Sequence, residues 1–209
     1  MKTFYFNDLR TCCYLLWDQT LECVIVDPGC YSDSEKGRIV KFVKENGLKP
    51  VKILCTHGHF DHILGAMFVS DEWQIPIYMS HEDMFWVKMA PVYCDSFGYS
   101  FTEIVKDIVD VKDGDIITFG DSKLQVIHTP GHSQGCVCYY NSEQNYLISG
   151  DTLFAQSIGR TDLPGGDLDK IKESIINRLF HLPGDTIVYP GHGTTTDIAT
   201  EKGSNPFLF

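Results

Sequence analysis

Residues 51–68 read VKILCTHGHFDHILGAMF, and the rest of the chain is organised around this stretch. Residues 51–55 have the apolar, β-branched character of a short buried strand. Residues 63–68 are apolar and suit a helix. Between the two, six residues contain three histidines and one aspartate, namely His57, His59, Asp61 and His62. The stretch therefore predicts a strand-to-helix turn, the kind of loop at a strand end that carries function.

The chemistry of this turn predicts a metal site. Neutral imidazole and carboxylate together are ligands for zinc, iron or manganese. A single histidine in a turn is usually structural. Four potential ligands on one tight turn are difficult to explain by packing alone.

The composition is that of an ordinary globular protein, with 209 residues, 43% of them hydrophobic and 22% charged. The net charge of −11 disfavours nucleic acid and anionic membranes as partners. No stretch has the length of a membrane-spanning helix, and the N-terminus lacks the apolar run of a signal peptide. We expect a cytoplasmic protein whose eight cysteines are mostly buried small hydrophobes. The oligomeric state is unknown at this point.

The segments before the cluster predict alternating strands and helices. A helix should begin at Ser32, where Ser32-Asp33-Ser34-Glu35 has capping-box spacing, and end near Asn46-Gly47. Strand, helix and strand in this order indicate a layered α/β architecture. The expected strands before this helix are 3–6, 12–17 and 21–26. The last of these runs into Asp27-Pro28-Gly29, where Asp27 either only shapes the turn or orients a ligand histidine.

After the cluster, one helix is expected to run to about Trp73 and a strand to cover 75–79. His81 should lie at a helix start and not be a ligand. Residues 84–102 follow no clean period, so we expect an irregular segment. Its aromatic side chains could wall a substrate pocket or cover a sheet edge, and both interpretations stay open.

The second half is predicted to be rich in strands at first. A helix should then begin at Asp167 and end before Pro183, and a brief helix is expected near 196–202. Since we find no linker and no tandem repeat, we expect a single domain over residues 1–209. The expected strands are 116–119, 123–128, 136–140, 145–149 and 186–189.

Three turns in this half repeat one pattern, a strand followed by glycine and then by a possible ligand. These ligands are His132, Asp151 and His192. Each is a weak signal alone, but with the first cluster they make seven ligands, enough for two metal ions. His128 lies inside a predicted strand and His181 at a helix end, so we expect both to be structural.

Together, Thr56–His62, Gly131-His132, Gly150-Asp151 and Gly191-His192 resemble the motif set of the metallo-β-lactamase superfamily. The resemblance implies an α/β fold, the αβ/βα four-layer sandwich of two mixed sheets packed face to face. It also implies that one metal takes His57, His59 and His132. The other would take Asp61, His62 and His192, with Asp151 bridging both.

Residues 157–167 look like the Gly-Arg-Thr-Asp segment of glyoxalase II-like hydrolases and of persulfide dioxygenases, and residues 205–208 resemble the tail of small glyoxalase II-like members. Full-length glyoxalase II enzymes carry a helical C-terminal domain that helps hold glutathione. We expect that domain to be absent, because the chain stops soon after His192. True lactamases fit less well, since one major class has Cys where Asp151 stands and another lacks a bridging ligand there.

The resemblance implies a hydrolase with two divalent ions, zinc first, with iron or manganese as alternatives. A metal-bridging hydroxide would attack a thioester such as a 2-hydroxyacyl-glutathione. Asp61 would be both a ligand and the catalytic acceptor that orients the water. Arg160 would bind a substrate carboxylate or else pair with Asp162 and hold its loop. The alternatives are a mononuclear iron persulfide dioxygenase and a non-catalytic metal-binding module.

Overall fold

The computed structural model describes residues 1–100 and 105–208, and the chain divides into two compact units. Unit 1 contains residues 1–110 and 118–122, and unit 2 contains the remainder. Each unit has its own sheet and its own hydrophobic core. The single domain over residues 1–209 therefore stays a prediction.

Unit 1 contains a mixed sheet of six strands in the order β1-β2-β3-β4-β5-β6. The first three strands pair antiparallel, and β3 to β6 pair parallel. The parallel strands end at the same edge, so the loops after β3 and β4 are neighbours. The sequence predicted all of these strands except β6. The strands are β1 (Lys2–Phe6), β2 (Thr11–Trp17), β3 (Glu22–Val26), β4 (Lys49–Leu54), β5 (Ile77–Met79) and β6 (Ile108–Asp110).

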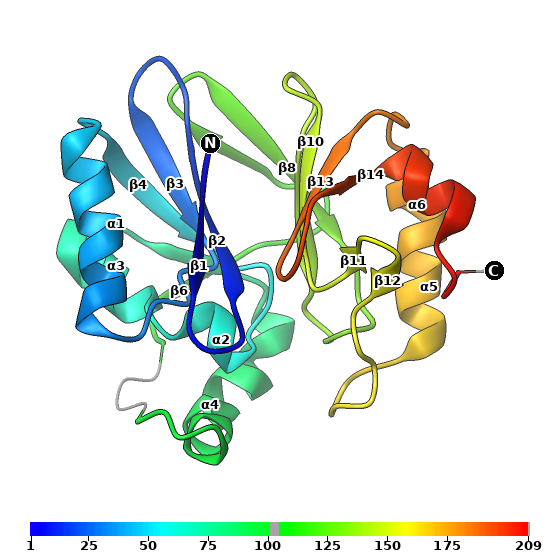
Figure 1. Ribbon diagram of the computed structural model, residues 1–209, viewed down its shortest axis with the longest axis horizontal. Coiled ribbons are helices and arrows are strands. Elements are labelled where there is room, and N and C mark those ends of the chain that lie inside the picture. Colours follow the sequence, from blue (N-terminus) through cyan, green and yellow to red (C-terminus); the bar gives the residue numbers. More distant parts are fainter. Residues whose placement is uncertain (101–104, 209) are drawn as a thin grey trace. The chain divides into compact units, whose positions relative to one another are not determined.

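The helices α1 (Asp33–Glu45) and α3 (Ala66–Trp73) lie together beside this sheet (Figure 1). The ammonium group of Lys36 in α1 lies 5.3 Å from the centre of the Phe68 ring in α3. α1 has the predicted capping box, in which the Ser32 hydroxyl accepts from the Glu35 N–H. The sequence thus located this helix correctly.

The single helix expected after the cluster is wrong in one respect, because it is broken into α2 (Phe60–Ile63) and α3. Gly65 lies at the break, and its N–H donates to the carbonyl oxygen of Pro28 at 2.8 Å. A Cβ at Gly65 would collide with the Cys30 side chain. The loop after β3 therefore packs closely against Gly65, and the helix is interrupted at this point.

The irregular segment expected over 84–102 is wrong, because most of it forms the helix α4 (Met84–Ser96), preceded by the 3₁₀ turn η1 (His81–Asp83). α4 contains Pro91 in its interior and exposes Val92, and both obscure the helical period. Its buried residues are Trp86, Val87, Ala90 and Cys94, which do follow helical spacing. Residues 101 and 102 of the segment lie outside the described residues.

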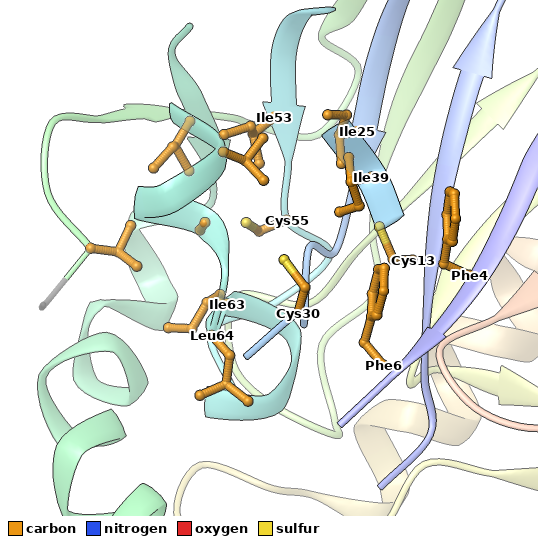
Figure 2. Packing of buried hydrophobic residues seen from close by; sticks show 14 of the residues in the cluster. Phe4, Phe6, Cys13, Ile25, Cys30, Ile39, Ile53, Cys55, Ile63 and Leu64 are labelled. Carbon is orange, nitrogen blue, oxygen red and sulfur yellow. The ribbon is translucent and has the colours of Figure 1, made fainter. Parts of the chain in front are cut away.

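The core of unit 1 is built from strands and helices together (Figure 2). It combines Phe4 and Phe6 from β1 with Ile53 from β4 and with the helix residues Ile39 and Ile63. Five cysteines are among its members, namely Cys13, Cys23, Cys30, Cys55 and Cys94. All eight cysteines of the chain are buried, and the sequence predicted this for most of them.

Unit 2 is built on a second sheet, in the order β14-β13-β10-β9-β8-β7. β9 pairs antiparallel with both β8 and β10, and β10 pairs parallel with β13. β8, β10 and β13 therefore run in one direction and end at one edge. The strands are β7 (Ile116–Phe119), β8 (Ser122–His128), β9 (Val137–Asn141), β10 (Tyr146–Gly150), β13 (Ile187–Pro190) and β14 (Thr196–Asp197).

Two helices, α5 (Leu168–Asn177) and α6 (Ile198–Ser204), lie together beside this sheet (Figure 1). Both contribute to the core of unit 2, through Ile171 and Ile198 among others. The 3₁₀ turn η2 (Leu179–His181) follows α5, and a small hairpin joins β11 (Leu153–Phe154) to β12 (Ser157–Ile158). Within residues 1–100 and 105–208, every helix is too short or too polar to cross a bilayer.

Candidate metal centre

The candidate ligands of unit 1 are held by the main chain at the ends of β3 and β4. Asp27 has a left-handed backbone with φ of 47°. Its carboxylate accepts from the N–H of Thr56 and from the Thr56 hydroxyl, both at 2.7 Å. It also lies 3.0 Å from Nδ1 of His62. Because a carboxylate can only accept, His62 donates from Nδ1 and turns Nε2 the other way. Asp27 thus shapes the turn and orients a histidine, so both readings of this residue hold.

His57 is held in the same way. The Thr56 hydroxyl has one proton, which it gives to Asp27, so its oxygen accepts from Nδ1 of His57 at 3.0 Å. This leaves Nε2 of His57 as the unprotonated nitrogen that a metal ion requires. The Nε2 atom lies 3.1 Å from Nδ1 of His59. Two nitrogens bound to one tetrahedral zinc ion at about 2.0–2.1 Å would be ~3.3 Å apart. The pair therefore has the spacing of two ligands of one ion.

His59 lies at the start of α2 and contacts α4. Its ring packs edge to face against the Trp86 ring, with the ring centroids 4.2 Å apart. The N–H of Gly58 donates to the buried carboxylate of Asp83 at 2.8 Å. A Cβ at Gly58 would lie 2.9 Å from the Asp83 carbonyl oxygen, so only glycine fits without a shift. The segment that begins at residue 84 thus supports the metal-binding loop through Trp86.

Asp61 is held from the first hairpin. The Thr11 hydroxyl donates to Oδ2 of Asp61 at 2.7 Å, and the Asn7 amide donates to the Asp61 carbonyl oxygen at 3.0 Å. Nε2 of His62 lies 3.4 Å from the same Oδ2 atom. Asp61 and His62 are therefore another pair with the spacing of two ligands of one ion.

Unit 2 carries its own group of candidate ligands, at the ends of its three strands that run in one direction. Asp151 follows β10, His132 follows β8 and His192 follows β13. The N–H of Gly191 donates to the Gly150 carbonyl at 2.8 Å and fixes the last two strand ends together. Oδ2 of Asp151 lies 3.5 Å from Nε2 of His132 and 3.6 Å from Nε2 of His192. One carboxylate oxygen thus faces both histidines of this unit.

His132 is oriented by main chain. Its Nδ1 donates to the carbonyl oxygen of Arg160 at 2.8 Å, which directs Nε2 towards Asp151. The loop that supplies this carbonyl lies against the turn after β10. A Cβ on Gly159 would overlap the Asp151 carbonyl oxygen, so Gly159 permits this approach.

The side chain of Arg160 pairs with Asp162, one of the two roles expected for it. Its guanidinium group donates two hydrogen bonds to the Asp162 carboxylate, at 2.8 and 2.7 Å, and both side chains are exposed. This pair raises the pKa of Arg160 and lowers that of Asp162 to about 2. In the structure Arg160 therefore pairs with Asp162, and its binding of a substrate carboxylate stays a prediction.

The remaining histidines lie where the sequence placed them. His81 begins η1 and is exposed, with its N–H donating to Asp110. His128 ends β8, with Nε2 2.9 Å from the carbonyl oxygen of Gln134. His181 is the last residue of η2.

Five residues that hold the ligands were missed by sequence reasoning: Asn7, Thr11, Thr56, Asp83 and Trp86. Four of these are distant in sequence from the residue they contact. Asn7, for example, bonds a residue 54 positions away. Thr56 was the exception, since a hydroxyl residue directly before the first histidine could have been considered as a hydrogen-bond partner.

The candidate ligands of each unit fit a divalent ion on two grounds. Their donor atoms are imidazole nitrogens and carboxylate oxygens, the set that zinc, iron and manganese share. In each unit these atoms lie 3.1–3.6 Å apart in pairs, and the opposite ring nitrogen of three histidines is held by an oxygen. Metal-ligating histidines are held in this manner.

The comparisons agree with this chemistry: the chain belongs to the metallo-β-lactamase superfamily, whose family profile matches residues 7–192. The predicted family and fold are thereby confirmed. The probable metallo-hydrolase YqgX of Bacillus subtilis is 40% identical, over 90% of this chain and 87% of that protein. The hydroxyacylglutathione hydrolase GloC of Haemophilus influenzae is 34% identical, over 94% of this chain and 92% of that protein.

Solved structures are similar along the whole chain. The BLEG-1 B3 metallo-β-lactamase superposes with a TM-score of 0.90 at 38% identity, over 99% of this chain and 98% of that one. The di-iron-bound form of TTHA1623 gives a TM-score of 0.89 at 33% identity, over the full length of both chains. The chain is therefore related to metallo-hydrolases and has a His/Asp metal-binding chemistry.

Proposed function

We propose that this protein is a metal-dependent hydrolase that cleaves thioesters, with 2-hydroxyacyl-glutathione as the substrate class. One observation carries the proposal. His57, His62 and His132 each donate from Nδ1 to an oxygen, so each is fixed with Nε2 as its metal-binding nitrogen. Such pre-oriented imidazoles favour a metal centre over a structural role.

The proposed ligands are assigned to ions as the family resemblance implies. One ion takes His57, His59 and His132. The other takes Asp61, His62 and His192. Asp151 is proposed as the shared ligand, in keeping with its Oδ2 atom lying close to both histidines of unit 2.

Divalent cations bound at such a centre would lower the pKa of water and polarise a substrate carbonyl. The chain's own residues would do the rest. Asp61 would accept a proton of the attacking water and orient it, since its Oδ2 atom faces His62. Asp27, Thr56 and the Arg160 carbonyl would keep the imidazoles in one tautomer through the reaction. A thioester suits this centre because a thiolate leaves with little help from a general acid.

Zinc is the first choice of metal, with iron or manganese as alternatives, and two ions per chain are proposed. The di-iron-bound form of the similar protein TTHA1623 supports the number and keeps iron open. The thioester is supported by the hydroxyacylglutathione hydrolase among the relatives. A cytoplasmic location and a small-molecule substrate complete the proposal.

A second candidate is β-lactam hydrolysis, because the similar BLEG-1 structure is that of a B3 metallo-β-lactamase. The mononuclear iron persulfide dioxygenase also stays open, since the resemblance of residues 157–167 covers both enzyme classes. A non-catalytic metal-binding module would bind ions and give no turnover in any assay.

The test uses protein purified without oxygen and analysed for metal. Each preparation is assayed for lactoyl-glutathione hydrolysis, for nitrocefin hydrolysis and for oxygen uptake with glutathione persulfide. We expect two ions per chain, thioester hydrolysis and loss of activity on chelation. One iron per chain with oxygen uptake would instead favour the dioxygenase, and nitrocefin turnover alone would favour the lactamase.

A matched pair of variants completes the test. Asp151→Ala should abolish hydrolysis and weaken the binding of both ions, because one carboxylate is proposed to serve them. Asp185→Ala removes an exposed carboxylate of the same unit and should change neither. An Asp151→Ala protein with both ions and a normal rate would remove Asp151 from the site.

A further inference from the structure

The first hairpin reaches the metal-binding loop through one buried hydroxyl group. Thr11 is the first residue of β2 and is fully buried. Its Oγ1 atom lies 2.7 Å from Oδ2 of Asp61, and this hydrogen bond is itself buried. An ionised carboxylate cannot donate, so the threonine hydroxyl gives its only proton to Asp61.

Asn7 fixes the position of that hydroxyl. Its Oδ1 atom accepts from the N–H of Leu9 at 3.0 Å, which sets the orientation of the amide. The two protons of Nδ2 are then shared among three oxygens, those of the Asp61 carbonyl at 3.0 Å, the Gly29 carbonyl at 3.1 Å and the Thr11 hydroxyl at 3.2 Å. The Thr11 hydroxyl therefore accepts a hydrogen bond from Asn7 while it donates one to Asp61.

The main chain around Asn7 is equally constrained. Asn7 has a left-handed backbone with φ of 51°, and its N–H donates to Glu35 at the start of α1 at 2.7 Å. A Cβ on Gly29 would collide with the Asp61 carbonyl oxygen. The hairpin and the loop after β3 thus form a rigid frame around Asp61.

The oxygen that Thr11 holds is the one that matters for metal binding. Oδ2 of Asp61 lies 3.4 Å from Nε2 of His62, the spacing of two ligands of one ion. From this geometry we infer that Thr11 is a positioning residue for Asp61, with Asn7 as its support. The inference rests on the proposed function, in which Asp61 and His62 bind the same ion.

The role is specific. The hydrogen bond selects one rotamer of Asp61 before the ion arrives, so little conformational entropy is lost on binding. It also stabilises the charged carboxylate. Hydrogen-bond partners of ligating residues typically change metal affinity by about 10–100-fold when they are removed.

The experiment measures zinc affinity of the full-length apo protein by competition with a fluorescent chelator. Thr11→Val keeps the shape and removes the hydroxyl, and Thr11→Ser restores it. Thr186→Val is the matched control, because Thr186 is also fully buried and donates to Asn145 at 2.6 Å, in unit 2. We expect about 10–100-fold weaker binding of one zinc equivalent in Thr11→Val alone, and near-normal binding in the other two.

Normal affinity of both zinc equivalents in Thr11→Val would overturn the inference, as would equal losses in Thr11→Val and Thr186→Val. If Thr11→Val does not fold, Asn7→Gly decides, since glycine accepts the backbone of this position and removes the amide. Normal zinc affinity in that variant overturns the inference. Lactoyl-glutathione hydrolysis at saturating zinc is measured separately, so a wild-type protein that binds zinc without turnover refutes the reaction and not the role of Thr11. A wild-type protein that binds no zinc refutes both.

Discussion

At the residue scale, Asp27 connects the end of β3 to the loop that carries the histidines. Three donors converge on its carboxylate, two from Thr56 and one from His62. Asp27→Asn would place an amide N–H₂ against one of these donors. We expect about 1–3 kcal/mol lower unfolding free energy and about 10–100-fold weaker metal binding.

Urea unfolding of the apo protein and chelator competition give the two quantities. Asp71→Asn is the control, because Asp71 is an exposed residue of α3. Asp27→Asn protein with normal metal affinity would show that the orientation of His62 is set by other contacts.

Gly58 is a second sensitive position. A Cβ there would lie 2.9 Å from the Asp83 carbonyl oxygen and 3.1 Å from Cβ of Trp86. We expect Gly58→Ala to lower the unfolding free energy by about 1–3 kcal/mol, as overpacking typically does. Gly37→Ala is the control, since nothing lies within 4 Å of that position in α1 and alanine favours the helix by about 0.5–1 kcal/mol. A Gly58→Ala protein as stable as wild type would contradict the close packing of α4 against this loop.

The sequence indicates candidate ligands through their residue types and spacing, whereas the residues that hold them could not be predicted. His57, His59 and Asp61 lie within one short motif whose chemistry is visible in the residue types. Thr11 is 50 positions from Asp61, and nothing in its local sequence marks it as a donor to a carboxylate. Such a contact depends on which hairpin packs against which loop, and that is a property of the fold.

At the element scale, α1 is stabilised at its start by a charged group. Burial alone would raise the pKa of Glu35, but hydrogen bonds from the N–H groups of Tyr31, Ser32 and Asn7 lower it below its ordinary value of 4.5. A lowered pKa means that the stabilisation is present above the unfolded pKa and is lost as the pH falls through the folded one.

The stability difference between wild type and Glu35→Gln should therefore be largest near neutral pH and shrink below about pH 4. Urea unfolding at a series of pH values measures it. Glu45→Gln is the control, because Glu45 is exposed and has only a 3.8 Å ion pair with Lys41. A pH-independent difference would mean that Glu35 acts through packing and not through its charge.

Elements with regular periods and clear end signals were predicted well, and those with mixed faces were not. α1 has its capping box and its Asn-Gly stop, and both were used. α4 exposes Phe85 and Val92 while burying Trp86, so apolar residues surround it and no period stands out. β6 has three residues and exists because it pairs with β5, which a local pattern cannot indicate.

At the scale of the whole molecule, all eight thiols are inside. Burial raises the pKa of Cys23 and Cys30 to about 12 and that of Cys138 to about 11. Only the thiolate reacts with disulfide reagents. We expect Ellman's reagent to modify no cysteine of the native protein promptly and all eight after unfolding in urea.

Ser34→Cys provides the control, since residue 34 is exposed in α1 and its thiol should react at once. Prompt modification of a native cysteine in the wild-type protein would show that the structure around that cysteine opens on the timescale of the assay.

Because His132 is oriented by the main-chain oxygen of Arg160, the effects of single substitutions at position 160 need careful interpretation. Every amino acid has that oxygen, so a library of all substitutions at position 160 would leave the partner of His132 intact. A scan of single substitutions would therefore score position 160 for its side chain alone and report nothing about the histidine. The orienting contact would become visible one residue earlier, at Gly159, where any side chain displaces the loop. A substitution scan can thus fail to detect a hydrogen bond at the residue whose main chain accepts it.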